Sequence, residues 1–172
     1  MSEHSFQGGE LDQGLCLDSI SGEEIVTRPR ILMADDHSLV LAGIRRLVEE
    51  LAEVVGTVED GRALLNEAQR LRPDIILLDI SMPLLNGIDA ARQLTKLMPE
   101  SKLIFVTMHA TPTYVAEAFK VGAAGYLLKQ SAADELKQAI QTVLRGQHYM
   151  TPSVTKGVMG AALHPIERPV SK

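Results

Sequence analysis

Short apolar runs alternate with helical patterns five times between Arg30 and Gly146. The runs are rich in Ile, Leu and Val, as at residues 75–78 and 103–106. Runs of this kind are typical of strands that are buried on both faces of a parallel sheet. Because parallel strands need crossover connections, the alternation predicts an α/β fold with helices on both faces of one sheet.

The expected strands are residues 30–35, 54–58, 75–79, 103–107 and 124–128. Four helices are expected to begin near Ser38, at Asp60, at Thr111-Pro112 and at Ser131, where side chains typical of helix starts precede apolar residues at helical spacing. A further helix is expected at residues 88–98. Five strands of this length suit a flavodoxin-like, doubly wound (βα)5 fold with strand order 2-1-3-4-5.

Four of the apolar runs end on residues with ionic or reactive side chains. These residues are the pair Asp35-Asp36, then Asp79, Thr107 and Lys129. In an open α/β sheet the carboxyl ends of the strands meet at one ligand-binding edge. Three carboxylates brought together would repel one another unless a cation intervened, and Mg²⁺ prefers such oxygen ligands together with phosphate oxygens. The sequence therefore predicts a site for a divalent cation and a phosphoryl group.

Asp79 stands alone after the central strand, where a carboxylate can act as a nucleophile toward phosphorus. Lys129 and Thr107 would stabilise the charge of the transferred group. A single Asp at a strand end is more often only a helix cap. All five residues lie at carboxyl ends, however, and this combination favours a phosphoryl site.

Residues 30–154 resemble the receiver domain of two-component response regulators. The matching pieces are the acidic pair at 35–36, the stretch LDISMPLLNG at 78–87, Thr107 and the stretch GYLLK at 125–129. The resemblance implies that Asp79 accepts a phosphoryl group from a sensor histidine kinase. It implies that Mg²⁺ is bound by Asp35, Asp36, Asp79 and the backbone carbonyl of Ser81. It also implies that Thr107 and Lys129 contact the phosphoryl group and that Thr107 and Tyr126 form the conformational switch.

The stretches DDHSLVLAGIR at 35–45, GAAGYLLK at 122–129 and YMTP at 149–152 are similar to those of NarL/FixJ-type regulators. That subfamily carries a C-terminal LuxR-type DNA-binding domain, so the resemblance implies transcription regulation and a homodimer on activation. Residues 156–172 do not match such a domain, and DNA contact is expected only through a domain missing from this sequence.

Three residues depart from the usual receiver pattern. Gln130 stands where many receivers have proline, which leaves the geometry of that loop open. Met108 follows Thr107 where a small residue is usual, and its bulk is expected to hinder access of a phosphodonor to Asp79. His109 is expected to be a solvent-facing loop residue, with an influence on phosphoryl hydrolysis as the alternative.

The sequence predicts three segments: a flexible acidic arm at 1–29, a receiver domain at 30–146 and a linker at 147–172 with a short helix near 153–163. The arm holds six acids against Arg28 and carries the whole formal net charge of −5. Cys16 is the only cysteine, and neither a secretory leader nor a membrane-spanning stretch is recognisable. A cytoplasmic protein without membrane contact is therefore expected.

Two alternatives remain open beside a transcriptional switch. One is a stand-alone receiver that acts through protein–protein contacts. The other is an enzyme, an aspartate-nucleophile phosphatase or phosphotransferase. Such enzymes usually place a second Asp two residues after the nucleophile, where this sequence has Ser81. The prediction is accordingly a signalling protein and not an enzyme.

Overall fold

The computed structural model describes residues 27–163. The expectations for residues 1–26, including most of the acidic arm and Cys16, and those for residues 164–172 lie outside this range. Within 27–163 no helix is both long and apolar enough to cross a membrane.

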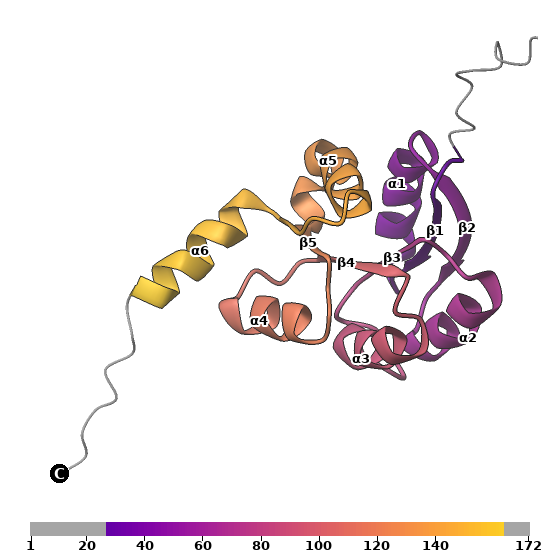
Figure 1. Ribbon diagram of the computed structural model, residues 1–172, viewed down its shortest axis with the longest axis horizontal. Helices are drawn as coiled ribbons and strands as arrows, with labels where there is room; N and C mark the ends of the chain where they lie inside the picture. The colour runs from indigo at the N-terminus through magenta and orange to yellow at the C-terminus, as the bar shows by residue number, and fades with distance from the viewer. Residues whose placement is uncertain (1–26, 164–172) are drawn as a thin grey trace, which may run out of the picture.

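The core of the molecule is one parallel sheet (Figure 1). Its strands are β1 (Arg30–Ala34), β2 (Glu53–Val58), β3 (Ile75–Leu78), β4 (Lys102–Thr107), β5 (Gly125–Leu128) and β6 (Tyr149–Met150). The order is β2-β1-β3-β4-β5-β6, and each neighbouring pair is parallel. The predicted order of the first five strands is confirmed. The short β6 was not predicted, and it covers the edge of β5.

Helices cover both faces of the sheet. They are α1 (Ser38–Glu49), α2 (Gly61–Leu71), α3 (Gly87–Leu97), α4 (Pro112–Lys120), α5 (Ala132–Leu144) and α6 (Pro152–Leu163), with a 3₁₀ turn, η2, at Lys129–Ser131. Figure 1 shows α1 and α5 on one face, α2, α3 and α4 on the other, and α6 projecting past α4. This arrangement is the predicted doubly wound α/β fold.

Alternate residues of each central strand enter two separate cores. In β3, Ile75 and Leu77 pack with α1 and α5, whereas Ile76 and Leu78 pack with α2, α3 and α4. All four side chains are at most 2% exposed. Because both faces are covered, the strand is apolar at every position instead of at every second one. This double burial fixes the strand ends on which the polar residues stand.

The predicted start of α2 is confirmed, with Asp60 as its N-cap. The Asp60 carboxylate accepts hydrogen bonds from the amides of Arg62 and Ala63. Asn86 caps α3 in the same manner, with its side-chain oxygen accepting from the amide of Asp89. Side-chain caps of this kind satisfy amides that have no partner within the helix.

Other predicted caps are wrong in detail. Ser38 is the first residue of α1, and the N-cap is His37, whose side chain makes no capping hydrogen bond. Thr111 and Ser131 are the N-caps of α4 and α5, but neither hydroxyl makes a capping bond. Pro112 does open α4, because its fixed φ suits the first helical turn and it lacks the amide hydrogen that would need a partner there.

The segment 147–163 folds against the domain. The helix expected near 153–163 is α6, and Val154 at its start is buried in the core shared with α4. The Tyr149 hydroxyl donates to Glu135 on α5 at 2.9 Å. Burial, with the hydrogen bond and charge of Glu135, raises the pKa of Tyr149 to about 12. The linker role of residues 147–172 stays a prediction.

Candidate functional site

The two acidic strand ends are held next to each other by the backbone. The amide of Asp35 donates to the Val58 carbonyl at 3.1 Å, and the amide of Asp79 donates to the Ala34 carbonyl at 3.0 Å. Each acid therefore extends the hydrogen-bonding ladder of the sheet by one residue. The acids project from rigid strand ends at the carboxyl edge of the sheet, the place that the sequence predicts for them.

Lys129 joins these two acids. Its Nζ lies 2.7 Å from Asp35 Oδ2 and 2.8 Å from Asp79 Oδ2. The side chains of Lys129 and Asp79 are 4% exposed, and that of Asp35 is 6% exposed. Ionic groups are almost never buried this deeply unless they are paired. A triad of buried side chains that spans the ends of β1, β3 and β5 is the central feature of the site.

The charge state of Lys129 follows from this geometry. Burial acts to lower the pKa of its ammonium group, whereas the hydrogen bonds and charges of Asp35 and Asp79 act to raise it. The attractive contributions prevail, so the pKa of Lys129 is raised above its usual value of 10.5. The group is a fixed positive charge at physiological pH.

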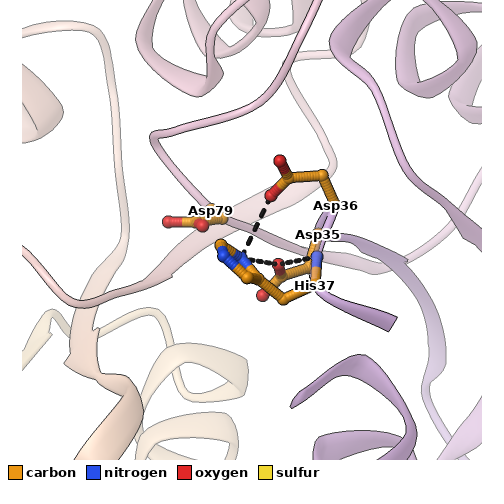
Figure 2. Close-up of side chains that lie close together, drawn as sticks. All are labelled: Asp35, Asp36, His37 and Asp79. Atoms are coloured by element: carbon orange, nitrogen blue, oxygen red, sulfur yellow. Dashed lines mark hydrogen bonds and ion pairs between the residues drawn. The ribbon is translucent and has the colours of Figure 1, made fainter. Parts of the chain in front are cut away.

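Asp36 and His37 complete an acidic cluster at the mouth of the site. Figure 2 shows the side chains of Asp35, Asp36 and His37 gathered beside that of Asp79. One ligand atom from each of the four residues can be chosen so that all lie within 4.8 Å of one another. His37 Nδ1 lies 3.2 Å from Asp35 Oδ1 and 3.1 Å from Asp36 Oδ1. The ring is largely exposed, yet it contacts both acids.

This cluster fits a divalent cation. Two buried carboxylates and one exposed carboxylate gather beside one ammonium group, which leaves an excess of negative charge at the site. Asp35, Asp36 and Asp79 offer the hard oxygen ligands that Mg²⁺ prefers, and the exposed Asp36 leaves the mouth open to water and phosphate oxygens. The predicted ligand Ser81 follows two residues after Asp79 in the loop that leads to α3.

The loop between β3 and α3 closes tightly around Asp79. Asp79 Oδ1 accepts a hydrogen bond from the amide of Ile80 at 2.7 Å, and the amide of Gly87 donates to the Ile80 carbonyl at 2.8 Å. Gly87 lies so close to the Asp79 backbone that a Cβ atom there would sit 1.9 Å from its carbonyl oxygen. Glycine is required at this position because no side chain fits.

The two predicted switch residues are fully buried, Thr107 at the end of β4 and Tyr126 within β5. Thr107 is 0% exposed, and its hydroxyl accepts from the amide of His109 at 3.3 Å. The Tyr126 ring is also 0% exposed, and its hydroxyl donates to the His109 carbonyl at 2.7 Å. Burial and then the negative charge of Asp79 raise the pKa of Tyr126. Both residues are thus connected to the loop that follows β4.

His109 is not the solvent-facing residue that was expected. Its ring is half-buried, Nε2 lies 2.8 Å from the Ser81 hydroxyl, and the ring packs on Tyr114 with centroids 4.5 Å apart. The loop after β4 is therefore joined to the loop after β3. This contact depends on loop conformation and rotamers, so the only signal in the sequence was the unusual histidine two residues after Thr107.

The structure also shows the positions of Met108 and Gln130, the other two residues that depart from the usual receiver pattern. Met108 is 66% exposed, and its expected effect on donor access stays a prediction. Gln130 lies within the 3₁₀ turn η2. The peptide bond before it is trans, because no cis bond occurs within residues 27–163.

Comparison with known proteins identifies the family. Residues 31–141 match the model of the response regulator receiver domain, and the chain belongs to this family. The transcriptional regulatory protein DegU of Brevibacillus brevis is 38% identical over 132 residues, which cover 76% of this chain and 56% of DegU. The response regulator GacA of Pseudomonas viridiflava is 36% identical over 129 residues, which cover 74% of this chain and 60% of GacA. The chain thus spans little more than half the length of these relatives.

Solved structures give the same assignment. A LuxR-family two-component response regulator from Aurantimonas sp. SI85-9A1 superimposes with a TM-score of 0.76 at 31% identity, over 80% of this chain and 99% of that one. The isolated receiver domain of RcsB from Salmonella enterica serovar Typhimurium, solved with the phosphomimetic BeF₃⁻, gives a TM-score of 0.71 at 29% identity, over 76% and 99% of the two chains. The resemblance to LuxR- or NarL/FixJ-type regulators that the sequence suggested is confirmed.

Proposed function

We propose that this chain is a phosphorylation-dependent signalling switch whose phosphoacceptor is Asp79. The observation that carries the proposal is the buried triad, in which Lys129 lies 2.7 Å and 2.8 Å from Asp35 and Asp79 at the carboxyl edge of the sheet. A buried ion triad with excess negative charge is costly for folding alone. Its arrangement suits a carboxylate that is to carry a phosphoryl group beside a fixed cation.

In the proposed reaction an Asp79 carboxylate oxygen forms a bond to phosphorus. The bond from phosphorus to the donor breaks, and the leaving group departs with the electron pair. With a sensor histidine kinase as donor, that bond is the phosphorus–nitrogen bond of a phosphohistidine. Bound at Asp35, Asp36, Asp79 and the Ser81 carbonyl, Mg²⁺ would supply positive charge to the phosphoryl oxygens. Lys129 and the Thr107 hydroxyl are proposed to contact those oxygens in the product.

The proposed conformational change after phosphorylation depends on the contacts that the new phosphoryl group makes. Thr107 and Tyr126 both bond to His109, so a shift of the Thr107 hydroxyl toward the phosphoryl group would change the loop that holds Tyr126. Such a change biases a two-state equilibrium by no more than the differential contacts of the phosphoryl group. The surface of α4, β5 and α5 is proposed to change its partner preference in response.

The wider role of the protein is proposed from its relatives. DegU is named as a transcriptional regulatory protein, and one RcsB structure is described as two dimers bound to two parallel DNAs. We propose that this chain likewise regulates transcription, that it forms a homodimer on activation, and that DNA contact is made by a C-terminal domain outside this sequence. The proposal treats the chain as a switch and not as an enzyme.

The proposal is tested by incubating the protein with Mg²⁺ and acetyl phosphate and measuring its intact mass. Wild type is expected to gain the mass of one phosphoryl group, and excess chelator is expected to suppress the gain. Asp79→Asn is expected to show no gain, because an amide is not a nucleophile toward phosphorus under these conditions. Asp134→Asn, on the exposed start of α5, is the control and is expected to behave as wild type. Equal labelling of Asp79→Asn and wild type would contradict the assignment.

A further inference from the structure

The buried hydroxyl of Thr151 has no role in the site described above. Among residues 27–163 the buried polar or charged residues are Asp35, Asp79, Thr107 and Thr151. The first three stand at the ends of β1, β3 and β4 and belong to the candidate site. Thr151 lies between β6 and α6 and is 1% exposed. A buried hydroxyl is retained where a hydrogen bond requires it.

Thr151 extends the pairing of β6 with β5 by one further bond. The Tyr149 amide donates to the Ala124 carbonyl at 3.0 Å, and the Thr151 amide donates to the Tyr126 carbonyl at 3.0 Å. The chain then turns into α6 at Pro152, so the strand pairing ends. The next amide on this edge of β5 is that of Leu128, and it donates to Thr151 Oγ1 at 3.2 Å. The side chain thus supplies an acceptor beyond the end of the strand.

The residue after Leu128 is Lys129. Thr151 therefore holds the Leu127–Leu128 peptide, which lies one residue before the Cα atom from which the Lys129 side chain extends to Asp35 and Asp79. Without the hydroxyl, a buried backbone amide would have no partner and this peptide would lose its fixed orientation. A small displacement of the Lys129 backbone is carried directly to its two contacts at 2.7 Å and 2.8 Å.

We propose that Thr151 is a positioning residue for Lys129, and that the segment from β6 to the start of α6 is a working part of the phosphorylation site. This inference rests on the proposed function. Val154 anchors the segment at 1% exposure, and the Tyr149 hydroxyl fixes it to Glu135 at 2.9 Å. Because coupling between two sites is reciprocal, a phosphoryl group that draws Lys129 away would also change how firmly the segment is held.

The inference is tested with three variants of the full chain. Thr151→Val keeps the shape and removes the acceptor, Thr151→Ser keeps the hydroxyl, and Thr155→Val is the control. Thr155 lies one turn further along α6, where its hydroxyl bonds, among residues 27–163, only to the Thr151 carbonyl, at 3.4 Å. All three are compared with wild type in the rate of phosphoryl labelling by acetyl phosphate with Mg²⁺. Exchange of the Leu128 amide hydrogen, followed by NMR, is the second measurement.

Thr151→Val is expected to slow labelling about tenfold, the effect of one lost hydrogen bond on the transition state. The Leu128 amide is expected to exchange faster in this variant, while the amide of core residue Ile104 stays as in wild type. Thr151→Ser is expected to restore both values, and Thr155→Val is expected to change neither. Wild-type labelling of Thr151→Val, or slow labelling of Thr151→Ser, would overturn the positioning role. If wild type itself takes no label, or labels independently of Asp79, the proposed function fails together with this inference.

Discussion

Lys129→Met is expected to reduce the rate of Asp79 labelling by about 100-fold or more, because it removes the one ammonium group within the described part of the chain, residues 27–163, that contacts the reacting carboxylate. The same substitution is expected to lower the free energy of unfolding at pH 7 by about 3 kcal/mol, since Asp35 and Asp79 are left buried without their partner. Labelling is measured by intact mass and stability by urea unfolding. Lys137→Met, on the exposed face of α5, is the control and is expected to change neither quantity.

Two conditions separate this explanation from a simple loss of packing. Added Mg²⁺ is expected to stabilise Lys129→Met more than wild type, because the ion would supply the missing positive charge. Raising the pH is expected to reduce the difference in stability between wild type and the variant. The raised pKa of Lys129 means that its contribution is fully present below 10.5 and is lost as the pH rises through the folded-state pKa. Wild type is therefore expected to lose its advantage over the variant above pH 10.5. If the lower stability of Lys129→Met depended on neither Mg²⁺ nor alkaline pH, the electrostatic explanation would be contradicted.

Gly87→Ala is expected to destabilise the fold by about 3 kcal/mol and to remove most labelling of Asp79. The added Cβ would lie 1.9 Å from the Asp79 carbonyl oxygen and 2.8 Å from its carbonyl carbon. These are backbone atoms of the strand end that carries the phosphoacceptor, so relief requires the loop from Asp79 to Gly87 to move. Urea unfolding and intact mass measure the two effects.

Gly43→Ala is the matched control. Gly43 lies in α1, where a Cβ would meet nothing within 4 Å. Alanine there is expected to raise the free energy of unfolding by up to about 1 kcal/mol, because glycine is a poorer helix former, and to leave labelling unchanged. If Gly87→Ala behaved like Gly43→Ala, the tight closure of the loop around Asp79 would be wrong.

The fold and the buried triad were predictable because both depend on periodicity. Strands such as β3 are apolar at every position, and that pattern fixes a sheet covered on both faces. Once the strands are parallel, their carboxyl ends must share an edge, so Asp79 and Lys129 meet although fifty residues separate them. Their opposite charges then lead them to form an ion pair.

The features that the sequence did not reveal depend on local geometry. β6 is only two residues long, too short to show any period, and its pairing depends on where α5 ends. The bond from His109 to Ser81 depends on the paths of two loops and on one rotamer. Thr151 looked like an ordinary residue before a proline, and only the course of β5 gives its hydroxyl a partner. In each case tertiary contacts, not propensity, determine the arrangement.

Locating the phosphoryl group within the labelled protein tests the central claim most directly. Wild type is labelled with acetyl phosphate and Mg²⁺ and then treated with borohydride, which reduces an aspartyl phosphate to homoserine with release of phosphate. Peptide sequencing by mass spectrometry then finds the homoserine. We predict that it stands at position 79 alone, since this is the carboxylate that faces both Lys129 and the acidic pair. Homoserine at Asp35 or Asp36 with none at position 79 would contradict the account.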